Sequence, residues 1–162
     1  MTDELNISSQ MFSRIEGTWR GQGRGEYPGV TSFDYRETLI FTRRDNKSLA
    51  YEQRAQKRYD GQTEWLVSHW ESGLIRILEN GTLEMVSAQI GRSEVLIGSI
   101  ETRAGIIRIH FVSKTITNDP RMISSTRSFE LEGDTLRYEM AMHTTKVERL
   151  TPHLKITLQL VK

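Results

Sequence analysis

Closely spaced turn signals divide most of the chain into short segments, and this spacing restricts the folds open to it. Turn-forming pairs recur along the 162 residues at Asp45-Asn46, Asp60-Gly61, Asn80-Gly81, Ala104-Gly105, Asn118-Asp119 and Gly133-Asp134. The segments between them alternate apolar and polar residues, or are rich in β-branched and aromatic residues, as strands are. Helical periodicity is nearly absent, so the pattern favours an all-β fold, either a barrel or a sandwich.

The segments give a count of ten or eleven strands. We expect them at residues 19–27, 33–42, 49–58, 64–70, 74–78, 83–88, 94–100, 106–114, 122–131, 135–142 and 153–161. Met11, Phe12 and Ile15 form one apolar stripe across residues 8–16, which predicts a short helix that closes one end of the fold. The prediction is an antiparallel up-and-down β-barrel of about ten strands with a short N-terminal helix, in one domain over residues 1–162.

Composition excludes several functional classes. The 22 basic and 21 acidic residues leave a net charge of +1, which gives no electrostatic reason to expect nucleic acid or an anionic membrane as a partner. The chain has no cysteine, so disulfides, cysteine-held zinc, iron–sulfur clusters and a thiolate nucleophile are excluded. The sequence shows neither a secretion signal nor an apolar run long enough to span a membrane, and we expect a cytoplasmic protein.

A glycine-rich stretch opens the first expected strand. Gly21 and Gly23 suggest a phosphate-binding GxGxxG motif, but Glu26 occupies the third glycine position and no helix pattern follows. Alternation instead places Trp19, Gly21, Gly23, Gly25 and Tyr27 on one strand face. Missing side chains on one face let another strand, a ligand or a bend come close, and we favour the bend.

The four histidines are spread over the chain without the spacing of a zinc site. His69 is expected to share a strand face with Trp65 and Val67, and His110 to be exposed. His143 directly follows one expected strand and His153 begins the last one. Glutamates are scattered over different strands and their pairing is not predictable, while the charged run at residues 54–58 indicates a solvated strand edge.

Several segments together resemble the nitrobindin family, haem-binding β-barrels similar in shape to lipocalins and fatty-acid-binding proteins. The signature GxWxGxG is matched by Gly17, Trp19, Gly21 and Gly23. Further matches are Phe33-Asp-Tyr35-Arg-Glu37, His69-Trp-Glu71-Ser-Gly73-Leu-Ile-Arg76, Val86-Ser-Ala88-Gln89, Tyr138-Glu-Met140-Ala-Met142 and Pro152-His153-Leu154. The resemblance runs in register from Gly17 to Lys162.

This resemblance implies one haem b per chain, ferric, with His153 as the ligand of the iron and the residue on which catalysis depends. Thr31, His69, Gln89 and Met142 are implied as further cofactor-binding residues. The implied activity is binding of nitric oxide and isomerisation of peroxynitrite to nitrate, with small molecules as the partners. The alternative function is a haem-free carrier of a fatty acid or another small apolar ligand, and the sequence leaves a homodimer open.

Three departures from the family pattern leave alternatives open. Gly29 stands where the family has a threonine, so either Thr31 replaces it or that contact is lost. An apparent insertion before His153 leaves either Met142 or His143 facing the pocket, and strand phase favours Met142. Alternation groups His153 with the polar residues of the last strand, so either the interior is partly polar or the strand end redirects the ring.

Overall fold

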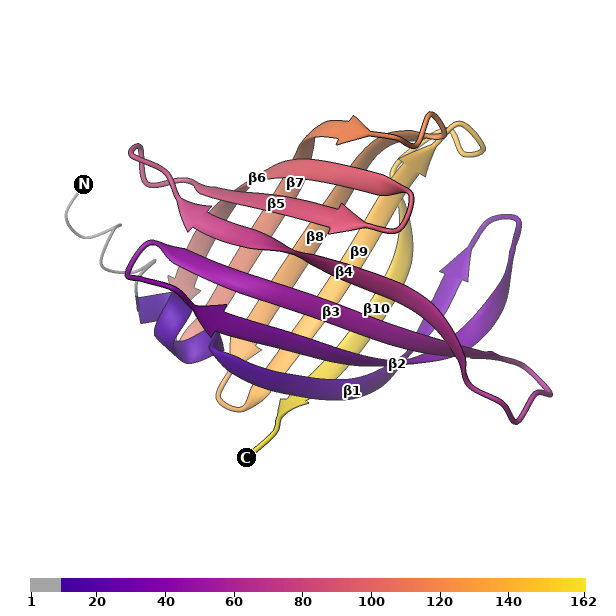
Figure 1. Cartoon of the computed structure of the whole chain (residues 1–162), viewed down its shortest axis with the longest axis horizontal. Helices are drawn as coiled ribbons and strands as arrows, with labels where there is room; N and C mark the ends of the chain where they lie inside the picture. Colours follow the sequence, from indigo (N-terminus) through magenta and orange to yellow (C-terminus); the bar gives the residue numbers. More distant parts are fainter. Residues whose placement is uncertain (1–9) are drawn as a thin grey trace.

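The computed structural model describes residues 10–162 and contains a closed barrel (Figure 1). Its strands are β1 (Gly17–Tyr27), β2 (Val30–Arg43), β3 (Ser48–Tyr59), β4 (Leu66–Ile77), β5 (Leu83–Gln89), β6 (Arg92–Arg103), β7 (Ile106–Thr117), β8 (Met122–Glu132), β9 (Thr135–Thr144) and β10 (Thr151–Leu160). Each strand pairs with its neighbour in the chain, and β1 pairs with β10 to close the sheet. The prediction of an up-and-down antiparallel barrel of about ten strands is confirmed.

The barrel forms because alternate residues of every strand point into one shared core. In β2, for example, Phe33, Tyr35, Glu37, Leu39 and Phe41 are buried, while the residues between them are more exposed. Aromatic side chains from several strands fill the centre, including stacked rings of Phe129 and Tyr138 with centroids 4.9 Å apart. The alternation seen in the sequence is therefore the alternation between interior and surface.

The short N-terminal helix (residues 10–15) lies across one end of the barrel, as predicted for its described residues (Figure 1). Residues 8 and 9 of the expected helix lie outside the described part. Trp19 of β1 is fully buried and its Nε1 donates to the Ile15 carbonyl at 2.8 Å. Arg14 Nη2 donates to the Gly105 carbonyl in the β6–β7 turn at 3.0 Å. These bonds attach the helix to the barrel wall and close that end.

We call the opposite end the mouth. It is formed by the connections that follow β1, β3, β5, β7 and β9, and it lies away from the helix in Figure 1. Large apolar side chains are exposed at this end, on these connections or on the strand residues next to them: Val30, Leu66, Val67, Ile90, Ile123 and Leu150. The mouth thus presents apolar surface that the barrel itself does not cover.

The glycine face of β1 has a structural role. A Cβ atom at Gly21 would lie 2.1 Å from the Thr157 carbonyl oxygen, and one at Gly25 would lie 2.3 Å from the Phe33 ring. Both approaches are closer than any Cβ contact allows, so β10 and the Phe33 ring occupy the space that a side chain on β1 would need. The glycines therefore serve the approach of a neighbouring strand and a ring of this chain, which is a structural role and not that of a phosphate site.

Two expectations about the strands are wrong. Residues 64–70 and 74–78 are not separate strands, because β4 runs unbroken through Gly73. This glycine allows close approach instead of making a turn, since its Cβ would lie 1.9 Å from the Val86 carbonyl oxygen of β5. The charged run in β3 is not a strand edge either, because β3 pairs with both β2 and β4.

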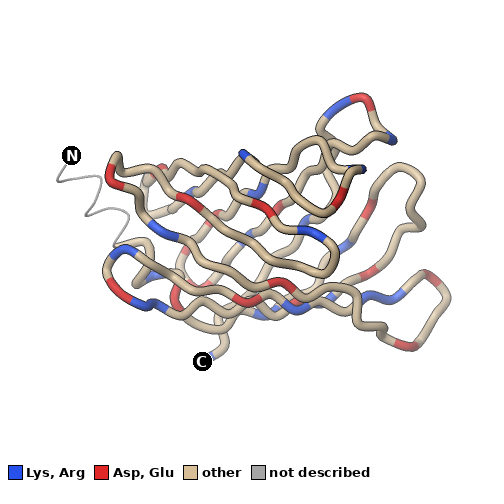
Figure 2. Tube along the Cα trace, turned by 45° about the horizontal axis from the view of Figure 1, so that its top comes forward, with Lys and Arg blue, Asp and Glu red and all other residues tan. Residues whose placement is uncertain are grey.

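Positive and negative side chains are interspersed over the barrel (Figure 2), in keeping with the net charge of +1. Many of them form ion pairs between neighbouring strands, such as Arg108 with Glu130 and Lys155 with Glu139, each at 2.7 Å. No helix in the described residues has the length and apolar character needed to cross a bilayer.

Candidate functional site

His153 lies at the mouth, in an irregularity near the start of β10. Pro152 pairs with Ala141 of β9 and Leu154 with Met140, so His153 is an extra residue between two regular pairs. Such a β-bulge changes the direction of a side chain relative to the strand's alternation. The His153 ring meets Tyr27 edge to face at 5.3 Å and Phe33 at 6.5 Å, and both of these rings belong to the inward face. The strand end therefore redirects the ring, which was one of the two alternatives from the sequence.

The surroundings of His153 favour a neutral imidazole. Burial lowers the pKa of His153 below its usual value, and the backbone of Glu26 offsets only part of this. Its Nδ1 atom is buried and has no hydrogen-bond partner of normal geometry in the described structure. On the outer side of the bulge His153 borders a groove of about 380 Å³ between β1 and β10. A neutral imidazole is a good metal ligand.

A second bulge, in β4, turns His69 inward. Ala55 of β3 pairs with His69, but the next residue of β3, Gln56, pairs with Val67. The extra residue in β4 reverses the alternation, so Val67 faces solvent and is 78% exposed. The expectation that His69 shares a face with Val67 and Trp65 is therefore wrong. His69 Nε2 instead lies 3.1 Å from Oε2 of the buried Glu71.

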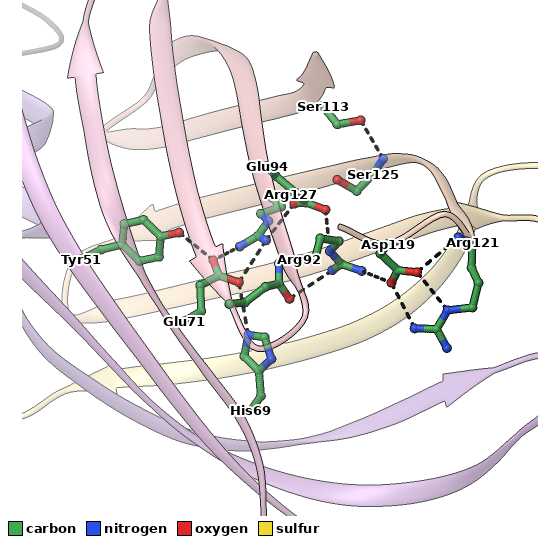
Figure 3. Close-up of polar contacts among 11 residues, drawn as sticks. Tyr51, His69, Glu71, Arg92, Glu94, Ser113, Asp119, Arg121, Ser125 and Arg127 are labelled. Carbon is green, nitrogen blue, oxygen red and sulfur yellow. Dashed lines mark hydrogen bonds and ion pairs between the residues drawn. The ribbon is translucent and has the colours of Figure 1, made fainter. Parts of the chain in front are cut away.

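Glu71 connects His69 to a buried network of charges in the barrel interior (Figure 3). Arg127 of β8 donates to both carboxylate oxygens of Glu71, and its Nη2 also lies 3.0 Å from Glu94 Oε2. The Tyr51 hydroxyl donates to Glu71 Oε1 at 2.7 Å. Burial by itself would raise the pKa of Glu71, but Arg127 and His69 lower it well below its usual range. Glu71 is thus an ionised carboxylate that can accept a hydrogen bond from His69.

The network continues from Glu94 to the mouth. Arg92 at the start of β6 forms an ion pair with Glu94, 2.9 Å between Nε and Oε1, and lies 3.9 Å from Asp119 in the β7–β8 connection. Asp119 also holds Arg121 at 2.9 Å. Figure 3 shows this succession of charged side chains running outward from Arg127. Two arginines, Arg92 and Arg127, therefore neutralise the two glutamates of β4 and β6.

Glu37 of β2 is a third buried carboxyl, and no cation among residues 10–162 is bonded to it. It is 3% exposed, and neither carboxylate oxygen has a hydrogen-bond partner of normal geometry in the described residues. Burial raises the pKa of Glu37 to about 7, and the nearby Gln53 offsets this only in part. A group with this pKa is protonated in part of the molecules at neutral pH.

The other predicted residues occupy different surroundings. Gln89 pairs with Glu71 at the end of β5, and its Oε1 accepts from Arg92 Nη2 at 3.2 Å. Met142 packs against the core cluster, while the next residue, His143, pairs with Ser124. The packing of Met142 agrees with the choice made from strand phase, and its role toward a ligand stays a prediction. Thr31 is exposed beside the turn at Gly29.

His153, His69, Gln89 and Met142 thus all lie near strand ends at the mouth, and Thr31 lies exposed on the β1–β2 hairpin. The sequence analysis missed Arg127 and Glu94 as members of the site. The sequence pattern does indicate them, because both are charged residues at strand positions that point inward. Arg127 lies two positions before the buried Phe129, and Glu94 lies two positions before the buried Leu96. The glycines of the GxWxGxG stretch belong to the wall of the barrel and not to this cluster.

Comparison with known proteins identifies relatives of the whole barrel. Residues 8–159 match the family model described as THAP4-like, heme-binding beta-barrel domain. The chain is 37% identical over 148 residues to a protein of Arabidopsis thaliana named peroxynitrite isomerase Rv2717c, covering 91% of this chain and 85% of that protein. It is 31% identical over 146 residues to peroxynitrite isomerase 2 of Mycobacterium ulcerans, covering 88% of each.

A solved structure of a similar protein has the same fold as this chain. The crystal structure of Rv2717c from M. tuberculosis superposes with a TM-score of 0.82 at 27% identity, covering 96% of this chain and 98% of that one. The resemblance to nitrobindins that the sequence motifs indicated is confirmed. The chain belongs to the family of THAP4-like, heme-binding β-barrel domains.

Proposed function

We propose that this protein binds haem b at the mouth of the barrel through His153 and isomerises peroxynitrite to nitrate. The observation that carries the proposal is the β10 bulge, which turns a neutral imidazole toward the aromatic residues Tyr27 and Phe33 at the open end. The names of the curated relatives supply the reaction, since they are peroxynitrite isomerases of 31% to 37% identity.

The residues present fit a haem group. Haem needs a neutral nitrogen ligand for the iron and apolar surface for the macrocycle. His153 offers the first, because burial lowers its pKa and so favours the neutral imidazole. The mouth offers the second through Met142 and the exposed Val30, Leu66 and Leu150. When bound, ferric haem would supply a Lewis-acid centre with one coordination position for peroxynitrite or nitric oxide.

The chain's own residues would hold and orient the ligand. The bulge fixes the direction of His153, and the edge contacts of Tyr27 and Phe33 restrict rotation of its ring. His69, held by the ionised Glu71, places a polar N–H group or a ring nitrogen at the mouth. The side chains around the mouth would exclude bulk water from the bound group and restrict the escape of a small ligand.

The interior argues against the alternative of a fatty-acid carrier. Such a carrier needs an apolar chamber along the barrel axis. The centre of this barrel contains the ion pairs of Arg127 with Glu71 and Glu94, whose burial disfavours an alkyl chain beside them.

The test is addition of hemin to the purified protein, followed by peroxynitrite. We expect a saturating Soret band at one haem per chain, and a haem-dependent increase in the nitrate yield over nitrite as peroxynitrite decays. Haem binding without a change in nitrate yield would confine the function to haem or nitric oxide binding. Saturable binding of a fatty acid with no Soret band would support the carrier instead.

A further inference from the structure

A groove of about 760 Å³ lies on the outer faces of β1 to β4, outside the site described above. These strands form the near side of the barrel in Figure 1. The groove is lined by outward-facing side chains, which include Arg20, Arg36, Arg54, Gln56, Val67 and Trp70.

The groove is positively charged. Arg20 is exposed and makes no ion pair among the described residues. Arg36 donates to Gln56 Oε1 at 2.6 Å and its guanidinium lies 4.7 Å from the Trp65 ring centroid. Arg54 pairs with Glu52, which is the one carboxylate held by these three arginines in the described structure. Three guanidinium groups and one carboxylate give the groove an excess of positive charge, which would attract an anion.

Flat apolar surface lies beside this charge. Trp70 is 54% exposed and Arg54 lies 5.2 Å from its ring centroid. Val67 is turned outward by the β4 bulge and is also exposed. Tryptophan faces and guanidinium planes stack well on flat aromatic groups, and guanidinium groups bind carboxylates or phosphates in fixed geometry. The arrangement therefore combines recognition of charge with recognition of an aromatic body.

The size of the groove favours a small molecule. Pockets for small ligands have volumes of about 300 to 1,000 Å³, and this groove lies in that range. A second copy of the chain does not fit the charge, because a two-fold interface centred on this groove would bring its group of arginines close to the same group of the partner. An anion of small size is the occupant that agrees with both the volume and the charge.

We propose that this groove binds a small aromatic anion, with its carboxylate or phosphate at Arg20 and Arg36 and its flat body against Trp70 and Val67. The site is separate from the mouth and the proposal does not depend on haem. Arg54, already paired with Glu52 and stacked on Trp70, positions the indole and does not need to be the anion's main partner.

Titration of the full-length, ¹⁵N-labelled protein with 2-naphthoate tests the proposal. The three tryptophans give three indole N–H signals, which single Trp→Phe variants assign. Trp19 is buried and donates to Ile15, so its signal serves as an internal control. We expect the Trp70 signal to shift in a saturable manner while the Trp19 signal stays constant. The uncharged 2-naphthylmethanol and inorganic phosphate should each bind at least about tenfold more weakly, since each lacks half of the required chemistry.

Variants locate the anion. Arg20→Gln, alone and combined with Arg36→Gln, should weaken 2-naphthoate binding by about tenfold per lost charged contact. Arg108→Gln is the matched control, because Arg108 is an exposed arginine paired with Glu130 on β7 and β8, outside the groove. Arg20 is exposed and makes no ion pair within the described part of the chain, so its replacement should leave the fold intact. The proposal is overturned if the Trp70 signal shows no saturable shift, or if 2-naphthoate binds both arginine variants as tightly as the Arg108→Gln protein.

Discussion

The imidazole of His153 and the ring of Tyr27 meet edge to face at the mouth, with centroids 5.3 Å apart and planes at 87°. The Tyr27 hydroxyl in turn lies 3.0 Å from Thr144 Oγ1 and 3.3 Å from the Met142 carbonyl of β9. Tyr27 therefore joins the end of β1 to β9 while its ring supports the bulged histidine of β10. The orientation of His153 depends on a residue more than a hundred positions away in the chain.

This relationship predicts different effects for two substitutions of Tyr27. Tyr27→Phe keeps the edge contact and loses the hydroxyl's hydrogen bonds, so the free energy of unfolding should fall by about 1 kcal/mol with haem affinity nearly unchanged. Tyr27→Ala removes the contact as well and should weaken haem affinity severalfold. Denaturant unfolding and hemin titration of the two variants measure these effects. Equal haem affinities for Tyr27→Ala and the wild type would show that the ring does not position His153.

His69→Leu should retain haem and change the reactivity of the iron. Glu71 keeps its bonds from Arg127 and Tyr51 in this variant, so the fold should survive. Loss of the polar group at the mouth should alter the rate at which nitric oxide binds the ferric protein, measured by stopped-flow absorbance. His110→Leu is the control, because His110 is exposed on the outer face of β7, where its Nδ1 contacts Ser128 Oγ at 2.9 Å. Complete loss of haem from a folded His69→Leu protein would transfer the ligand role from His153 to His69.

Much of this barrel was predictable because strand alternation is a local property. The period of two in residues such as Phe33, Tyr35 and Leu39 reports directly which side chains enter the core. Bulges are less visible, since one extra residue in β4 reversed the expected face of Val67 relative to His69. Gly73 was misread because a glycine in a turn and a glycine under a close strand contact look alike in sequence.

The buried charges could not be paired from the sequence. Arg127 is 56 residues from Glu71 and 33 from Glu94, and only the closed barrel brings the three together. A charged residue at an inward-pointing strand position indicates that it has a partner, but it does not indicate which residue that partner is. His153 was identified by resemblance to a family motif, while the physical cause of its orientation, the bulge after Pro152, required the register with β9.

Arg127→Met should destabilise the protein strongly. It leaves Glu71 and Glu94 buried without their shared cation, and breaking a buried pair by removing one partner costs about 3 to 5 kcal/mol. Arg137→Met is the matched control, because this exposed arginine pairs with Glu130 and Glu132 and its loss should cost less than about 1 kcal/mol. Denaturant unfolding at neutral pH compares them. Similar losses in both variants would contradict the account of the interior network.

Glu37→Gln should change how stability depends on pH. Burial raises the pKa of Glu37 to about 7 from 4.5, so the folded state binds this proton more tightly than the unfolded state. The contribution of protonated Glu37 to the free energy of unfolding is fully present below pH 4.5. It is lost as the pH rises to about 7. Groups that face Glu37 are Gln53, Glu71, Arg127, Tyr35 and Tyr138.

The Gln variant removes this titration. Relative to the wild type, its free energy of unfolding should therefore rise by on the order of 3 kcal/mol between pH 4.5 and pH 7. Glu139→Gln, an exposed glutamate paired with Lys155, provides the control and should show no such rise. Denaturant unfolding of the three haem-free proteins across this pH range makes the comparison. Parallel pH profiles for Glu37→Gln and the wild type would show that Glu37 titrates as an ordinary carboxyl.

The most direct test of the proposed function is hemin titration of His153→Ala beside His143→Ala. His143 is a half-buried histidine near the end of β9, and its side chain points to the opposite face of the strand from that of Met142. Its loss should therefore leave haem binding unchanged. His153→Ala should fold, because it removes no core apolar group, and its haem affinity should fall by more than about tenfold with an altered Soret band. If His153→Ala instead keeps the wild-type Soret spectrum and haem affinity, His153 is not the ligand and the proposed site is wrong.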